Sequence, residues 1–249
     1  MIGMITTPHL PSSKVKHIII GKKYRNLLET AIFEHDLYPI WLDDDPYVDE
    51  RLSGHVDLSV VQISNTLYMA KYLSDCELNN EVKRLGFDVR YCNDPGKDYP
   101  EDAGLNFCII GKRLIYNPKT AISITNIDYN CISVRQGYTK CSVCIVDEQS
   151  IITSDRMIAE ALLNDGMNVL YISKPFVKLE GYAYGFIGGA SFKISQDELA
   201  FTGVIKDAEI RKLIEDFLHE RNIRPIYLTE NEIFDIGSAI PLTEELSKG

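Results

Sequence analysis

Two short segments of this chain carry residues that could form a cysteine-based reaction centre. The first reads Gly54-His55-Val56-Asp57, and the second reads Gly104-Leu105-Asn106-Phe107-Cys108. A cysteine thiolate is a strong nucleophile, and a nearby imidazole can supply or remove the protons that covalent catalysis needs. The sequence therefore suggests Cys108 as a nucleophile and His55 as its acid/base partner.

Each of these residues also has a structural interpretation. If residues 56–60 form a strand, alternate positions share one face, so His55 and Asp57 point the same way. Such a pair can serve a reaction or form a purely structural hydrogen bond. Cys108 stands in the apolar stretch 107–110, where a cysteine can also be a small buried core residue.

The elements that must position these residues repeat along the chain. Each unit is expected to contain a strand, a turn, a second strand, a helix and a third strand. The leading glycines stand at positions 54, 104, 137, 188 and 237, separated by 50, 33, 51 and 49 residues. Repetition at a fixed period is typical of architectures built from one supersecondary unit.

The clearest unit follows Gly188. Residues 190–194 and 199–203 read as strands, positions 210, 213, 214 and 217 form one apolar helix face, and residues 226–228 read as the third strand. Comparable units occupy residues 141–172 and 56–91, earlier in the chain, where Gly166 and Gly86 are expected to end the helices. The unit at 108–116 is the poorest, and its helix is at best short.

The fifth unit is split between the two ends of the chain. Residues 16–20 and 38–42 are expected strands, with a helix between them, and residues 234–240 supply the missing strand. This last strand would complete the first unit and close a ring without exposed edges. We predict a single α/β domain over residues 1–249, a propeller of five ββαβ units; an ordinary α/β sheet is the alternative.

With these units and the His55 and Cys108 segments, the chain resembles the penteins, fivefold α/β-propellers that include arginine deiminase, agmatine deiminase, dimethylarginine hydrolase and the amidinotransferases. The resemblance implies that His55 is the general acid/base, Asp57 binds a guanidinium group and Cys108 is the nucleophile. It also implies an acidic residue from the preceding unit, which is Asp235 here. Penteins usually carry the cysteine near the C-terminus, so Cys108 implies a permuted order of units.

The resemblance implies a hydrolase of an arginine- or agmatine-like guanidino compound, acting through a covalent thiouronium on cysteine. Such chemistry needs no cofactor and no metal. Ribosome anti-association factors share the fold without catalysis, so a binding module with a protein partner is the alternative. Further candidates for substrate binding are Asn106, Ser191 and Ser238.

Composition limits the classes of partner. The 249 residues include 36 acidic and 26 basic side chains, a formal net charge of −10, which disfavours nucleic acid and anionic membranes and suits a cationic ligand. The start of the chain lacks the pattern of a signal peptide, and six scattered cysteines suit free thiols, so we expect a cytoplasmic protein. On a strand, Cys141 and Cys144 would point to opposite faces, which disfavours a shared metal. The sequence leaves the oligomeric state open.

Overall fold

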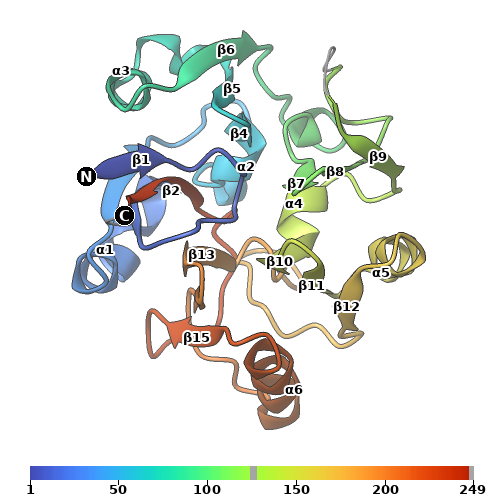
Figure 1. Ribbon diagram of the computed structural model, residues 1–249. Helices are drawn as coiled ribbons and strands as arrows, with labels where there is room; N and C mark the ends of the chain where they lie inside the picture. Colours follow the sequence, from blue (N-terminus) through green and yellow to red (C-terminus); the bar gives the residue numbers. More distant parts are fainter. Residues whose placement is uncertain (124–127, 247–249) are drawn as a thin grey trace.

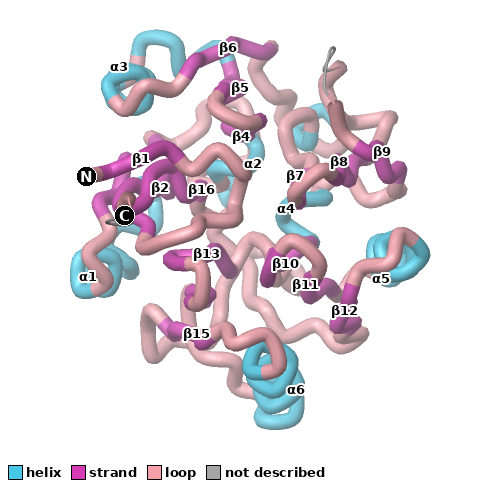
Figure 2. Tube along the Cα trace, in the orientation of Figure 1, coloured by secondary structure: helices cyan, strands magenta, loops and turns pink. Residues whose placement is uncertain are grey.

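The protein is a mixed α/β structure in which small sheets surround the middle of the molecule (Figure 1). The computed structural model describes residues 1–123 and 128–246. Five separate sheets are present in this part of the chain, one with four strands and four with three. The longer helices lie toward the outside, whereas the two four-residue helices at 56–59 and 139–142 lie nearer the centre (Figure 2).

The strands are grouped by sheet as follows. The four-stranded sheet contains β1 (Ile2–Met4), β16 (Ile240–Glu245), β2 (Val15–Gly21) and β3 (Tyr38–Leu42). Two of the three-stranded sheets contain β4 (Val60–Ile63), β5 (Thr66–Ala70) and β6 (Asp88–Cys92), and β7 (Cys108–Ile110), β8 (Arg113–Tyr116) and β9 (Asn130–Ser133). The other two contain β10 (Val143–Asp147), β11 (Ser150–Thr153) and β12 (Asn168–Tyr171), and β13 (Ser191–Ser195), β14 (Glu198–Phe201) and β15 (Arg224–Tyr227).

All five sheets share one pairing pattern. The first two strands of each unit are antiparallel and the second and third are parallel, as in β4, β5 and β6. In the four-stranded sheet, β16 takes the place of the first strand and pairs antiparallel with β2. A parallel pair needs a crossover connection, which a helix supplies in four units. These helices are α1 (Arg25–Glu34), α3 (Glu77–Arg84), α5 (Arg156–Asn164) and α6 (Ala208–His219).

Each of these helices forms for a local reason. In α6, Asp207 accepts hydrogen bonds from the backbone N–H groups of Glu209 and Ile210, and an apolar face is buried. Gly86 and Gly166 follow α3 and α5 with φ angles of +92° and +82°, as expected of residues that end helices. In the third unit, residues 117–123 contain no helix, and any short helix at 124–127 lies outside the described residues. None of the described helices has the length and apolar character needed to cross a membrane.

The main hydrophobic core is divided among five clusters, each of which joins two neighbouring sheets. One contains Ile18 and Phe192, a second Ile152 and Phe201, and a third Ile19 and Val60. The remaining two join the β7 sheet to its neighbours, through Ile110 with Val143 and through Phe107 with Val61. The α/β class is therefore confirmed, whereas no sheet closes on itself and the closed five-unit ring stays a prediction.

Three predicted strands begin later than expected. Residues 56–59 form the short helix α2 (Val56–Ser59), residues 139–142 form α4 (Thr139–Ser142), and residues 234–239 form a loop. In α4 the hydroxyls of Thr139 and Ser142 donate to the backbone carbonyls of Gln136 and Tyr138, which favours a helical turn over a strand. The inner strands start only after these segments.

Candidate active site

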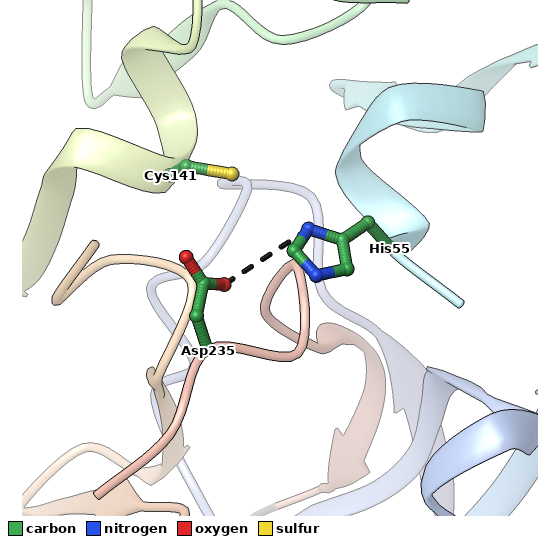
Figure 3. Close-up of side chains that lie close together, drawn as sticks. All are labelled: His55, Cys141 and Asp235. Atoms are coloured by element: carbon green, nitrogen blue, oxygen red, sulfur yellow. Dashed lines mark ion pairs between the residues drawn. The ribbon is translucent and has the colours of Figure 1, made fainter. Parts of the chain in front are cut away.

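Three side chains from distant parts of the chain meet on the inner side of the sheets (Figure 3). His55 precedes α2, Cys141 belongs to α4, and Asp235 lies in the loop that leads to β16. Their ligand-type atoms all lie within 4.8 Å of one another. The closest approach of His55 to Asp235 is 4.0 Å, between Nδ1 and Oδ1. All three residues are buried.

The thiol of Cys141 is held by two further side chains. Its Sγ donates a hydrogen bond to Oδ2 of Asp57 at 2.8 Å. Asn106 contacts Cys141 twice, because its Nδ2 donates to Sγ at 3.3 Å and its Oδ1 accepts from the Cys141 backbone N–H at 3.2 Å. Two bonds to one residue fix both the backbone and the thiol, so Asn106 positions Cys141.

The carboxylate of Asp235 is oriented by the backbone. It accepts hydrogen bonds from the N–H groups of Phe186 and Gly237, at 2.8 Å and 2.9 Å. Gly189 packs so closely on this carboxylate that a Cβ there would collide with it. Gly237 has a φ of +66° and lies against His55, where a side chain would also collide. Glycines therefore allow His55 and Asp235 to approach each other.

Burial shifts the protonation equilibria of the group. Burial, together with the charges of Asp57 and Asp235, raises the pKa of Cys141 well above its ordinary value. Burial raises the pKa of Asp57 to about 7, opposed by the positive charge of Lys140. Burial also lowers the pKa of His55, and Asp235 partly offsets that effect. The free protein thus favours a neutral imidazole and a protonated thiol.

The group lies at the bottom of a cavity of about 270 Å³, lined in part by His55, Cys141 and Asp235. Among the described residues, Nε2 of His55 and Oδ1 of Asp57 are buried without a hydrogen-bond partner. A buried polar atom without a partner costs about 1–3 kcal/mol. A ligand that donates hydrogen bonds would relieve that cost. His55 lines the cavity, whereas Asp57 does not line it and reaches the lining residue Cys141 through a hydrogen bond.

The structure brings together four of the seven residues singled out in the sequence. His55, Asp57, Asp235 and Asn106 all contact or adjoin the group around Cys141. Cys108 instead begins β7 within the hydrophobic cluster shared with β10, where burial raises its thiol pKa to about 12. The structure therefore places Cys108 in the core, apart from the group of His55, Cys141 and Asp235.

The two predicted serines support the backbone around the site. Ser191 donates to the Ile187 carbonyl at 2.7 Å, and Ser238 donates to the Ser191 carbonyl at 3.1 Å. Ser238 also accepts from Nζ of Lys140 at 3.0 Å. Neither serine lines the cavity in the described structure.

Sequence reasoning missed Cys141 as the thiol next to His55. A signal for it was present, because Cys141 follows Gly137 by four residues, just as Cys108 follows Gly104. The Cys-X-X-Cys spacing with Cys144 drew attention to metal or redox chemistry instead. Cys144 is buried in the core cluster between β10 and β13, and only Cys141 belongs to the group with His55.

The same three side chains could hold a metal ion, since a thiolate, an imidazole and a carboxylate are all zinc ligands. We expect micromolar zinc to slow alkylation of Cys141 by iodoacetamide at pH 8 at least about tenfold, because a bound thiolate cannot attack. Peptide mass analysis would locate the adducts, and EDTA should restore the rate. The exposed Cys131 is the internal control. Equal rates at Cys141 with and without zinc would contradict the expectation.

Solved structures of low sequence identity share this fold. The inosamine-phosphate amidinotransferase of Streptomyces griseus matches with a TM-score of 0.61 at 8% identity, covering 99% of this chain and 98% of that one. The agmatine deiminase of C. jejuni matches with a TM-score of 0.51 at 10% identity, covering 97% and 96%. A dimethylarginine dimethylaminohydrolase of Pseudomonas aeruginosa, in complex with citrulline, matches with a TM-score of 0.50 at 10% identity, covering 94% and 100%.

These structures share the fold of this chain, and their enzymes are of the kinds named in the sequence resemblance to the penteins. No curated protein sequence matches the chain. Residues 19–240 match the profile of the "Family of unknown function (DUF6873)", and the chain belongs to that family.

Proposed function

We propose that this protein is a hydrolase of a guanidino compound and that Cys141, rather than Cys108, is its nucleophile. The observation that carries the proposal is the contact of the Cys141 thiol with Asp57, beside His55 and Asp235, at the bottom of a cavity. A delocalised guanidinium is a poor electrophile. Attack on its carbon needs a thiolate, carboxylates that hold the cation, and a proton donor for the leaving nitrogen.

In the first step, the thiolate of Cys141 attacks the central guanidinium carbon. On substrate binding the thiol proton of Cys141 passes to His55, which gives the thiolate and the imidazolium. The C–S bond forms while one C–N bond breaks, and the leaving nitrogen takes that proton from the imidazolium of His55. The product is a thiouronium on Cys141 and a free amine or ammonia. The unpartnered Nε2 of His55 is available for this transfer.

In the second step, neutral His55 removes a proton from water, and the resulting hydroxide attacks the thiouronium carbon. The C–S bond then breaks, so the Cys141 thiolate leaves and a urea is released. His55 has gained the proton that it donates in the next cycle. No oxidant, reductant or cofactor is needed for this balance.

A cationic substrate would itself activate the thiol. The nearby carboxylates of Asp57 and Asp235 disfavour a Cys141 thiolate in the free protein. A guanidinium paired with those carboxylates would offset their charge, and its N–H groups would satisfy the unpartnered Oδ1 of Asp57. The thiolate therefore becomes favourable when the substrate is present.

One feature supports an enzyme over a binding module. The bottom of the cavity is polar, and it carries the nucleophile, base and acid that the chemistry needs. The hydrophobic clusters that join neighbouring sheets in turn support the closed five-unit propeller as the scaffold.

A cationic affinity label tests the proposal. We expect 2-chloroacetamidine to alkylate Cys141 at least about tenfold faster than neutral 2-chloroacetamide does, after correction for their rates with free cysteine, because the carboxylates attract only the amidine. Intact-protein and peptide masses would follow each adduct. The preference should grow as the pH rises through 7, since the pKa of Asp57 is about 7 and its carboxylate forms in that range.

Asp57→Asn should remove most of this preference, whereas Asp128→Asn removes an equal charge from an exposed position and should leave it intact. If Cys141 reacts with the amidine and the amide at equal corrected rates, or only after unfolding, the guanidine site is refuted.

A further inference from the structure

The cavity above Cys141 has walls of one chemical kind. The bottom holds His55, Cys141 and Asp235, and the walls are apolar or aromatic. The wall residues that matter here are Leu52, Leu58, Tyr138, Leu179, Tyr184 and Phe186. Several come from the long loop between β12 and β13, whose Phe186 backbone also holds Asp235. The same loop therefore forms part of the cavity wall and orients Asp235.

The aromatic side chains form a continuous cluster. Phe186 packs edge-on against Tyr184, with 6.2 Å between the ring centroids, and packs against Tyr138 at 6.3 Å with the two rings tilted by 43°. Tyr138 in turn packs on Tyr99 at 5.4 Å. Tyr184 is 48% exposed, so part of this aromatic surface faces an occupant of the cavity or solvent. An aromatic ring of a bound ligand could pack edge-to-face against this cluster.

Within the described residues, no lysine or arginine lines this cavity. The Tyr138 hydroxyl is already committed, because it donates to Asp102 at 2.6 Å. A carboxylate at the end of a substrate would thus lose its water without gaining a charged partner, which is costly. An amino-acid tail like that of arginine does not fit these walls.

The buried Lys140 acts electrostatically on Asp57, but it donates to Ser238 and to the Gly188 carbonyl and does not line the cavity. Three other cations line a neighbouring hollow and are also engaged. Arg51 forms an ion pair with Asp49, donates to the Gly181 carbonyl and lies 4.5 Å above the Tyr182 ring. Lys178 pairs with Glu232 at 2.7 Å, and Lys23 donates to backbone carbonyls of residues 50 and 51. These contacts hold the loops around the cavity and leave its walls apolar.

From these walls we infer that the substrate is a guanidine with an aromatic or other apolar substituent, of which benzylguanidine is the simplest probe. The guanidinium lies at Asp57 and Asp235, and the ring lies among Leu179, Tyr184 and Phe186. This inference rests on the proposed guanidine chemistry and replaces the arginine-like tail expected from the sequence with an apolar one.

Protection of Cys141 from 2-chloroacetamidine tests the substrate class. We expect benzylguanidine to halve the labelling rate at a concentration at least about tenfold lower than methylguanidine, agmatine or arginine requires, since burial of one ring favours binding by that much or more. If arginine or agmatine protects best, the apolar substrate is refuted while the guanidine site stands. If the amidine shows no preference for Cys141 over the neutral amide, the guanidine site itself fails.

Variants of the wall separate ring recognition from cation recognition. Phe186→Ala keeps the backbone N–H that holds Asp235, and we expect it to weaken protection by benzylguanidine about tenfold while protection by methylguanidine is unchanged. Phe186→Leu should restore part of the loss. Tyr184→Ala is a second test at an exposed position, and Tyr171→Ala on β12, outside the cavity lining, is the matched control. Equal protection by benzylguanidine in all four variants would overturn the assignment of the ring site.

Discussion

Replacing Cys141 with serine is expected to lower the rate of guanidine hydrolysis at least about 10³-fold, because a serine hydroxyl beside two carboxylates does not ionise and cannot form the thiouronium. Cys108→Ala should leave the rate essentially unchanged and cost about 1 kcal/mol of stability, since it shortens a packed side chain in the core. Release of urea or ammonia from benzylguanidine would measure both variants.

The comparison also needs proof that each variant is folded. Thermal unfolding and circular dichroism would provide it, and trapping of a covalent adduct by acid quench should succeed with the parent protein and fail with Cys141→Ser. A Cys108→Ala protein that is folded but inactive, together with an active Cys141→Ser protein, would reverse the assignment of the nucleophile.

Asp57→Asn is expected to abolish activity and to make the protein more stable. The carboxylate has a pKa of about 7 in the folded protein and an ordinary value of 3.8, so folding favours its protonated form. Its contribution to stability is therefore greatest below pH 4, declines as the pH rises toward 7, and is constant above that. At pH 8 the ionised Asp57 lowers the free energy of unfolding by at most about 4 kcal/mol. The side-chain amide of Asp57→Asn avoids this cost, and its oxygen can still accept the hydrogen bond from Cys141.

Denaturant unfolding of both proteins from pH 4 to pH 8 would measure this effect. We expect the two stabilities to converge near pH 4 and Asp57→Asn to be the more stable at pH 8, while hydrolysis falls at least about 100-fold because the cation loses a bidentate partner. Asp128→Asn serves as the exposed control. A loss of stability at pH 8 in Asp57→Asn would mean that the carboxylate is a structural partner and not a binding group.

The repeated units were readable from the sequence because hydrophobic periodicity reports burial directly. The strand at 38–42 matches β3. The predicted helix face at 210, 213, 214 and 217 lies within α6, where Ile210 and Ile214 are buried but Leu213 is 52% exposed. The segments that carry the site were less predictable. Residues 139–142 and 56–59 form single helical turns, stabilised by local bonds such as that of Thr139 to the Gln136 carbonyl, which a strand pattern does not reveal.

The choice between Cys108 and Cys141 could not be made from spacing alone. Both follow a leading glycine by four residues, and both are fully or almost fully buried. What separates them is a three-dimensional contact, since only Cys141 faces Asp57 across the inner side of the sheets. Cys108, the nucleophile predicted from the sequence, lies in the unit next to that of His55, whereas Cys141 lies in the unit after it.

The pairing of β16 with β2 links residues more than 200 positions apart, and the loop that carries Asp235 leads into β16. During synthesis, Cys141 and His55 emerge from the ribosome before Asp235 does, so the complete group can assemble only after residue 235 has emerged. Since β16 lies between β1 and β2, its detachment would break both pairings and free the adjoining Asp235 loop in one event. Detachment of β16 and loss of Asp235 as the acidic partner of His55 are therefore coupled. Slow hydrogen exchange of the β16 amides should accordingly accompany retained activity.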